Sequence, residues 1–133
     1  MKIKLTFVRE QISVTAELNK STNSISFFNK LPLKVPLYHA RWCGNEVFAP
    51  IGGVGYVKED ETILPSIGEL SIAPIGNGCN FGIWYGRGWC FGPDGNKPVS
   101  IIGKILDDTS VYSEACNNCI LIGASEIIIE NLA

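Results

Sequence analysis

Apolar and polar side chains alternate with a period of two from residue 2 to residue 18. In residues 2–7 every second side chain is apolar, and residues 12–18 repeat the pattern after the polar turn Arg9-Glu10-Gln11. Because successive side chains of a β-strand point to opposite faces, the pattern predicts a hairpin with one buried and one solvated face. This hairpin favours a mainly β protein.

The remainder of the chain also reads mostly as strands separated by turn residues. Further strands are expected over 37–42, 46–50, 68–74, 80–85, 98–106 and 126–131. Short helices are expected at 25–31, after the capping residues 21–24 and before Pro32, and at 107–118. About eight strands with no βαβ alternation predict a closed antiparallel β-barrel with two short helices, a form that leaves no exposed sheet edge.

The composition limits the classes of protein to consider. The 133 residues are room for a single domain, 1–133, and 46% apolar against 18% charged residues excludes disorder. A net charge of −2 without a basic run argues against nucleic-acid binding. No apolar run is long enough to span a membrane, and no export signal is visible, so we expect a cytoplasmic protein without a membrane partner.

Five scattered cysteines, an odd number, argue against a disulfide framework. Cys116 and Cys119 form the only C-x-x-C, and no second pair or histidine pair accompanies it to complete a zinc site. On a short helix, positions i and i+3 share a face, so we expect two buried thiols there. The sequence therefore predicts neither a metal nor a cofactor.

Several segments resemble cyclophilins. The segments GELSIAP from Gly68, Asn80-Phe81 and NKPVSIIGKILDD follow the order of that family's later strands. The stretch HARWCGNEVFAPIGG, together with PSIGEL, is closer still to a bacterial cyclophilin-like domain family of unassigned function. The resemblance covers most of the chain and implies a cyclophilin-like barrel.

The resemblance carries the prolyl-isomerase site over only in part. It implies that the catalytic arginine, one pocket phenylalanine and the loop tryptophan correspond to Arg41, Phe48 and Trp89. The family's glutamine, second phenylalanine and histidine fall on Ile51, Gly82 and Val99, which supply neither the hydrogen bonds nor the ring. Fold alone does not imply function, and half of the apparatus is missing.

Two segments could carry a binding site. In the strand expected around 37–43, His39 and Arg41 share one face, where Arg could bind a carboxylate and His could exchange a proton. The alternative is that this face only meets solvent, with Tyr38 and Trp42 in the core in either case.

The second segment is the glycine-rich, aromatic stretch 83–95, whose loop could stack a flat ligand or could simply turn, with Phe81 in the core. Together with the resemblance, these segments give the candidate ligand-binding residues His39, Arg41, Phe48, Arg87 and Trp89. We expect Arg41 and Trp89 to face one cleft.

The expected function is the binding of a small polar or anionic metabolite with an amide or carboxylate group. Whether a reaction follows, and hence whether the protein is an enzyme, stays open. Two alternatives are a peptidyl-prolyl isomerase and a non-catalytic module that forms homo-oligomers.

We predict little or no acceleration of X-Pro isomerisation, because Ile51, Gly82 and Val99 lack the groups that the isomerases use. Uncatalysed exchange takes roughly tens to hundreds of seconds, so a peptide assay detects even modest catalysis. A rate well above background that disappears in Arg41→Ala would contradict this prediction.

Overall fold

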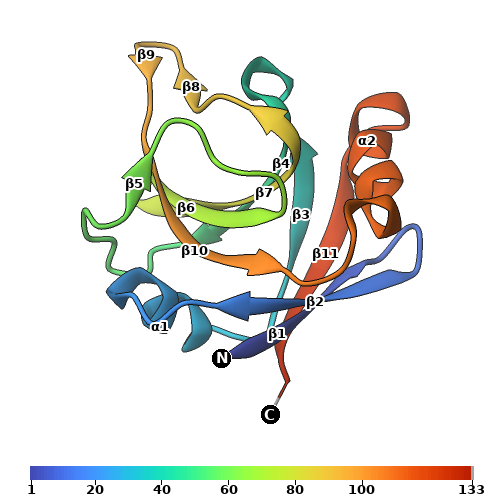
Figure 1. Ribbon diagram of the computed structural model, residues 1–133, viewed down its shortest axis with the longest axis horizontal. Helices are drawn as coiled ribbons and strands as arrows, with labels where there is room; N and C mark the ends of the chain where they lie inside the picture. The colour runs from blue at the N-terminus through green and yellow to red at the C-terminus, as the bar shows by residue number, and fades with distance from the viewer. Residues whose placement is uncertain (133) are drawn as a thin grey trace.

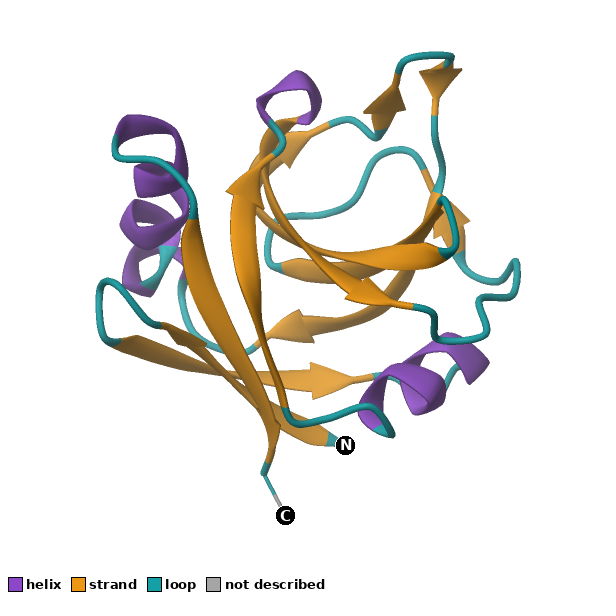
Figure 2. Cartoon of the chain, turned by 180° about the vertical axis from the view of Figure 1, so that it is seen from behind, coloured by secondary structure: helices purple, strands orange, loops and turns teal. Residues whose placement is uncertain are grey.

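The computed structural model describes residues 1–132, which form one closed antiparallel barrel of eight strands with two short helices (Figures 1 and 2). Around the barrel the strands follow the order β2-β1-β11-β3-β4-β7-β6-β10, and β10 pairs with β2 to close it. In chain order these are β1 (Lys2–Phe7), β2 (Ile12–Leu18), β3 (Leu33–His39), β4 (Gly44–Gly52), β6 (Glu69–Ile75), β7 (Gly78–Gly88), β10 (Val99–Ile105) and β11 (Ser125–Asn131). The predicted fold class is confirmed.

Three two-residue strands complete the structure. β5 (Glu61–Thr62) pairs with the start of β10. β8 (Phe91–Gly92) and β9 (Gly95–Asn96) form a small separate hairpin at the end of the molecule opposite α1 (Figure 1). None of these short strands was predicted, because a two-residue pairing leaves no periodicity in the sequence.

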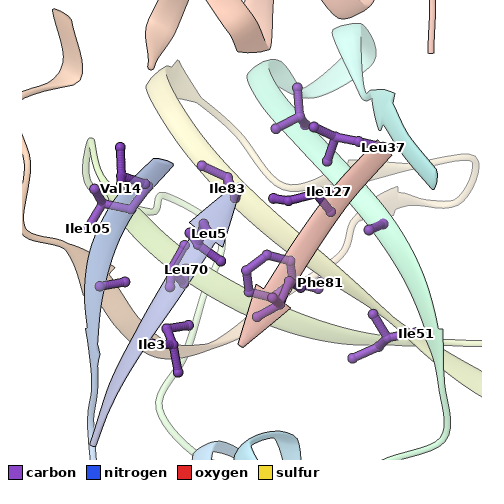
Figure 3. Packing of buried hydrophobic residues seen from close by; sticks show 14 of the residues in the cluster. Ile3, Leu5, Val14, Leu37, Ile51, Leu70, Phe81, Ile83, Ile105 and Ile127 are labelled. Atoms are coloured by element: carbon purple, nitrogen blue, oxygen red, sulfur yellow. The ribbon is translucent and has the colours of Figure 1, made fainter. Parts of the chain in front are cut away.

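The barrel interior is filled by the alternating side chains of its strands. The predicted N-terminal hairpin is confirmed: Leu5 pairs with Val14, and both lie in the core. Phe81 is also in the core, as predicted, and its ring stacks on Phe27 with centroids 5.0 Å apart. Figure 3 shows Phe81 among aliphatic side chains that come from most of the strands.

Helix α1 (Thr22–Phe28) lies three residues earlier than the expected 25–31, because Ser21, the first of the capping residues, is the N-cap and its side chain accepts a hydrogen bond from the Ser24 N–H. Its buried face differs from the predicted apolar stripe, since Ile25 is exposed while Asn23 and Ser24 are fully buried. The Asn23 amide donates to the Val57 carbonyl and to Ser100, which ties the helix to the 54–60 loop and to β10.

Helix α2 (Ser113–Leu121), preceded by the 3-10 turn η2 (Thr109–Val111), packs against β3, β4 and β7. Cys116 and Cys119 are buried on its inner face, as the sequence predicts.

The strand expected to run through residue 43 is shorter in the structure. β3 ends at His39, and residues Arg41–Cys43 form a 3-10 turn, η1, that leads into β4. His39 and Arg41 therefore share no strand face. Tyr38 and Trp42, expected in the core, are 40% and 59% exposed. Trp42 lies beyond the end of β3, where the period-two rule no longer places a side chain, whereas Tyr38 lies within β3 and points away from the buried face of Leu37.

One sector of the barrel is covered on both faces. Five consecutive residues of β7, from Phe81 to Tyr85, are buried, as are Leu70 to Ile72 of β6. On the outer face of β7, Trp84 packs in a second apolar cluster with residues from segment 40–43, from the β7–β8 connection and from the start of β10. The residues of this cluster are Ala40, Cys43, Trp84, Cys90 and Val99.

We predict that Phe81→Ala lowers the free energy of unfolding by about 3–5 kcal/mol, because it leaves a cavity beside the Phe27 ring in a packed interior. The matched substitution Phe91→Ala, at a ring that is 44% exposed, should cost about 1 kcal/mol or less. Urea unfolding of both variants measures the difference. Equal losses would show that the barrel interior does not carry the stability.

Candidate functional site

A cavity of about 500 Å³ lies on the outer face of the barrel sector formed by β4, β7, β6 and the start of β10. The η1 turn borders it, and the β8–β9 hairpin with its flanking residues, called the lid below, contributes the rest of its lining. The lining residues are mostly apolar, and the polar side chains among them are Glu46, Ser71, Asn80 and Lys97, together with the thiols of Cys43 and Cys90.

The floor follows from strand alternation. Val47 and Ile83 point into the barrel, so their neighbours in sequence point outwards. Glu46 is paired with Trp84 across β4 and β7, and Ser71 is paired with Gly82 across β6 and β7. Three adjacent strands thus direct one carboxyl, one indole and one hydroxyl to the same floor.

Gly82 leaves the space that this arrangement needs. A Cβ at residue 82 would collide with Oε2 of Glu46 and would lie 2.7 Å from Oγ of Ser71. The two polar side chains therefore meet above the bare backbone of β7. The Trp84 Nε1–H donates to Oγ of Ser71 at 2.9 Å, so the serine still has its own hydroxyl proton to donate.

The carboxyl group of Glu46 is in an unusual environment. The residue is only 8% exposed, and the one ion pair among residues 1–132, Arg9 with Glu10, does not involve it. Burial raises the pKa of Glu46 to about 8, and the neighbouring Cys43 thiol lowers it only in part. At neutral pH this carboxyl is mostly protonated, so it can donate a hydrogen bond or exchange a proton with a bound molecule.

The two thiols of the cavity are not activated. Burial raises the pKa of Cys43 to about 11 and that of Cys90 to about 12, so both stay protonated at neutral pH. Cys43 is also engaged with the lid, since its Sγ bonds to the Phe91 carbonyl at 3.2 Å and to the Phe91 N–H at 3.3 Å. A nucleophilic role needs a thiolate, so these two cysteines contribute to the cavity as neutral lining side chains.

Aromatic side chains form the rim. Trp42 lies edge-on to Phe48, with ring centroids 5.8 Å apart, and Tyr38 packs on the other flank of Phe48 at 5.6 Å. Across the cavity lining, Phe91 of the β8–β9 hairpin is 44% exposed. Exposed aromatic side chains grouped around a hollow are typical of a ligand or partner site.

The five candidate residues from the sequence do not form one group. Phe48 lines the cavity. Arg41 and Arg87 are exposed, and neither is among the lining residues. Trp89 is outside the lining as well; its Nε1–H donates to Asn96 at 2.8 Å and braces the β8–β9 hairpin.

His39 lies away from the cavity, at the end of β3. Its Nε2 is 2.5 Å from the Tyr85 hydroxyl, and the two rings meet edge-to-face. Burial, together with the Arg41 charge, lowers the pKa of His39. Burial, followed by the nearby Cys116 and Cys119 of α2, raises the pKa of Tyr85 to about 12, so this pair lies towards α2.

The described residues contain no group of three or more His, Cys, Asp or Glu side chains arranged to hold a metal ion. All five cysteines are buried and free. In the part of the chain that the structure covers, no helix combines the length and apolar character needed to cross a membrane.

Sequence reasoning missed Glu46, Ser71 and Asn80, which supply most of the polar chemistry of the cavity. One signal was present: Phe81, Ile83, Trp84 and Tyr85 form an almost continuous apolar run interrupted only by Gly82. Such a run indicates a strand buried on both faces. Glu46 is paired with Trp84 of this strand, so the two side chains lie on the same outer face of β4 and β7.

Fold and site together define a small antiparallel barrel with a lidded, mostly apolar cavity on its outer wall and a buried carboxyl at the floor. The chain belongs to the family described as "Protein of unknown function (DUF3830)", which it matches over residues 5–130. An assignment to a family without an established function agrees with the sequence prediction. No curated protein matches the chain.

Two solved structures show the same fold. The structure of McbB in complex with tryptophan has a TM-score of 0.76 and 17% sequence identity; the match covers 97% of this chain and 44% of McbB. The solution structure of the hypothetical protein AF2241 from Archaeoglobus fulgidus has a TM-score of 0.65 and 16% identity, covering 99% and 95% of the two chains. This chain therefore spans less than half the length of McbB.

We predict that the stability penalty of Glu46 grows as the pH rises. Its folded pKa of about 8 exceeds the ordinary value of 4.5, so the folded state holds the proton more tightly than the unfolded state. The free energy of unfolding therefore falls between about pH 4.5 and about pH 8. Glu46→Gln removes this loss, so its stability relative to the wild type should rise from about pH 5 to about pH 9 in urea titrations.

The exposed Glu126→Gln is the matched control and should show a constant difference from the wild type. A constant difference for Glu46→Gln as well would mean that its carboxyl titrates at the same pH in the folded and unfolded chains.

Proposed function

We propose that the protein binds a small organic molecule with a flat apolar body in the cavity, and that a polar group of this molecule meets Glu46. The observation that carries the proposal is the Glu46 carboxyl itself, buried in a mostly apolar hollow without a cationic partner. Burying an unpaired carboxyl costs stability and adds nothing to the packing of the barrel. A ligand that hydrogen-bonds to this carboxyl would offset the cost of its burial.

The size and walls of the cavity support this proposal. Ligand pockets usually enclose roughly 300–1,000 Å³, with apolar walls and a few placed polar groups. The cavity of about 500 Å³ falls within this range, and the rings of Phe48, Trp42 and Phe91 give it flat surfaces. Aromatic walls favour a ligand that is itself flat.

An amide or carboxylate on the ligand has a partner in Lys97, the cation among the lining residues. A charge-assisted hydrogen bond from Lys97 could hold such a group under the lid. Arg41 directly precedes Trp42 of the rim, so its exposed guanidinium is available to an anionic ligand that approaches. Arg87 lies at the end of β7, and Trp89 lies between β7 and the lid. From these positions they would influence how a ligand enters the cavity.

McbB has been solved in complex with tryptophan, a molecule with a flat ring system, an amine and a carboxylate. The fold match at 17% identity does not transfer that ligand. It does recommend indole-sized compounds among the first probes.

The proposal extends to the cellular compartment and to contact between copies of the chain. Five buried free thiols suit a reducing compartment such as the cytoplasm. Exposed Ile120, Leu121 and Ile122 at the end of α2 would suit contact between copies in a homo-oligomer.

The test is a fragment screen by ligand-observed NMR, run in parallel on the wild type and on Ala73→Leu. Ala73 lines the cavity from β6, so a larger side chain there fills the space without replacing a polar group. We expect flat aromatic fragments to bind the wild type and to lose about tenfold or more in affinity in the variant, a change of about 1.4 kcal/mol.

Ala124→Leu, at an exposed position outside the cavity, is the control and should bind like the wild type. If the wild type binds no more fragments than Ala73→Leu does, the proposed function is wrong.

A further inference from the structure

We propose that the cavity selects ligands that carry an ammonium group, held by the Glu46 carboxylate between aromatic walls. This inference rests on the proposed function and adds the charge of the ligand to it. It reverses the sign that the sequence suggested for the principal charged contact, because the buried charged group of the site is an acid and the two candidate arginines lie outside the lining.

The first argument is the missing counter-charge. Glu46 makes no ion pair with any described residue, although its carboxyl is buried beside Ser71 and above Gly82. A buried carboxylate is stable only when it is paired, and neither Lys97 nor any other cation of the described residues forms an ion pair with Glu46. A ligand ammonium group in the cavity would form this pair.

The second argument is the nature of the walls. Phe48 lines the cavity from β4, where it is paired with Gly82 of β7, and the exposed rings of Trp42 and Phe91 line it from η1 and β8. The faces of aromatic rings attract cations, and a cage of rings with a nearby acid is a recurring way to bind an ammonium group. The same rings give no favourable contact to a carboxylate placed on the floor.

The third argument comes from the other titratable groups that line the cavity. These are Cys43 from η1, Cys90 after β7 and Lys97 after β9, while β6 and β7 contribute none. Both thiols stay neutral because burial raises their pKa to about 11 and about 12. Glu46 is therefore the one acidic group of the lining that can be ionised near neutral pH, and Lys97 remains free for an anionic end of the same ligand.

Binding of an ammonium ligand then has a proton signature. With its pKa at about 8, Glu46 is mostly protonated at neutral pH in the free protein. An ammonium group favours the carboxylate, so the proton leaves Glu46 for the solvent on binding. A neutral ligand of the same shape releases none.

The experiment uses three compounds with one ring system: tryptamine, 3-ethylindole and indole-3-propionate. We expect tryptamine to bind at least about tenfold more tightly than 3-ethylindole at pH 7, and also more tightly than indole-3-propionate, whose carboxylate has Lys97 but not Glu46 as a partner. Titration calorimetry in phosphate and in Tris should show the release of close to one proton with tryptamine. Above about pH 9 the release should vanish, because Glu46 is then already ionised.

Glu46→Gln should lose both the preference for tryptamine and the proton release, while Glu126→Gln keeps both. Should Glu46→Gln fail to fold, the titration of Glu46 in the wild type, followed by carbon NMR, replaces it and should move to lower pH when tryptamine is present. Equal binding of tryptamine and 3-ethylindole, or no binding of tryptamine, overturns the inference. The proposed function falls separately, through the fragment comparison with Ala73→Leu.

Discussion

The hydrogen-bonded closure of β10 onto β2 is the constraint on which the remaining features depend. Once the barrel is closed, every strand has a fixed inner face, and register assigns each outward side chain to a place on the wall. The site is a direct consequence. Glu46, Trp84 and Ser71 reach one floor because three neighbouring strands are in register, and a shift of one residue in β4 would turn Glu46 into the barrel interior.

The fold was predictable because it follows from local periodicity. The hairpin of β1 and β2, the start of α1 after Ser21 and the buried position of Phe81 all come from patterns a few residues long. The same reasoning failed at Tyr38, where it chose the wrong face of β3, and at Trp42, which lies in the 3-10 turn that follows β3. Turns of this kind are set by tertiary hydrogen bonds, such as that from the Trp89 N–H to the Cys43 carbonyl, which span distances that no window of sequence covers.

The site was less predictable because it is made of residues that are unremarkable in sequence. A glutamate in an alternating strand reads as a solvent-facing charge, and Glu46 becomes unusual only when the β8–β9 hairpin and η1 cover the outer face above it. Arginine, histidine and tryptophan attracted attention because of their chemistry, yet Arg41 and Trp89 lie outside the cavity lining. Arg41 lies next to Trp42 of the rim, and Trp89 lies next to the β8–β9 hairpin.

The free-energy cost of the site comes mainly from burying the Glu46 carboxyl, and this cost explains the residues that surround it. A carboxyl that must stay buried without a partner is tolerated only if it can remain protonated, and an apolar surrounding provides that condition. Gly82 allows the carboxyl to lie close to the backbone, Ser71 is already engaged by the Trp84 indole, and the Cys43 thiol is engaged by Phe91. The surrounding groups are thus largely engaged with one another, and Glu46 has the Cys43 thiol beside it but no ion-pair partner among the described residues, which is the position that the proposed ligand would fill.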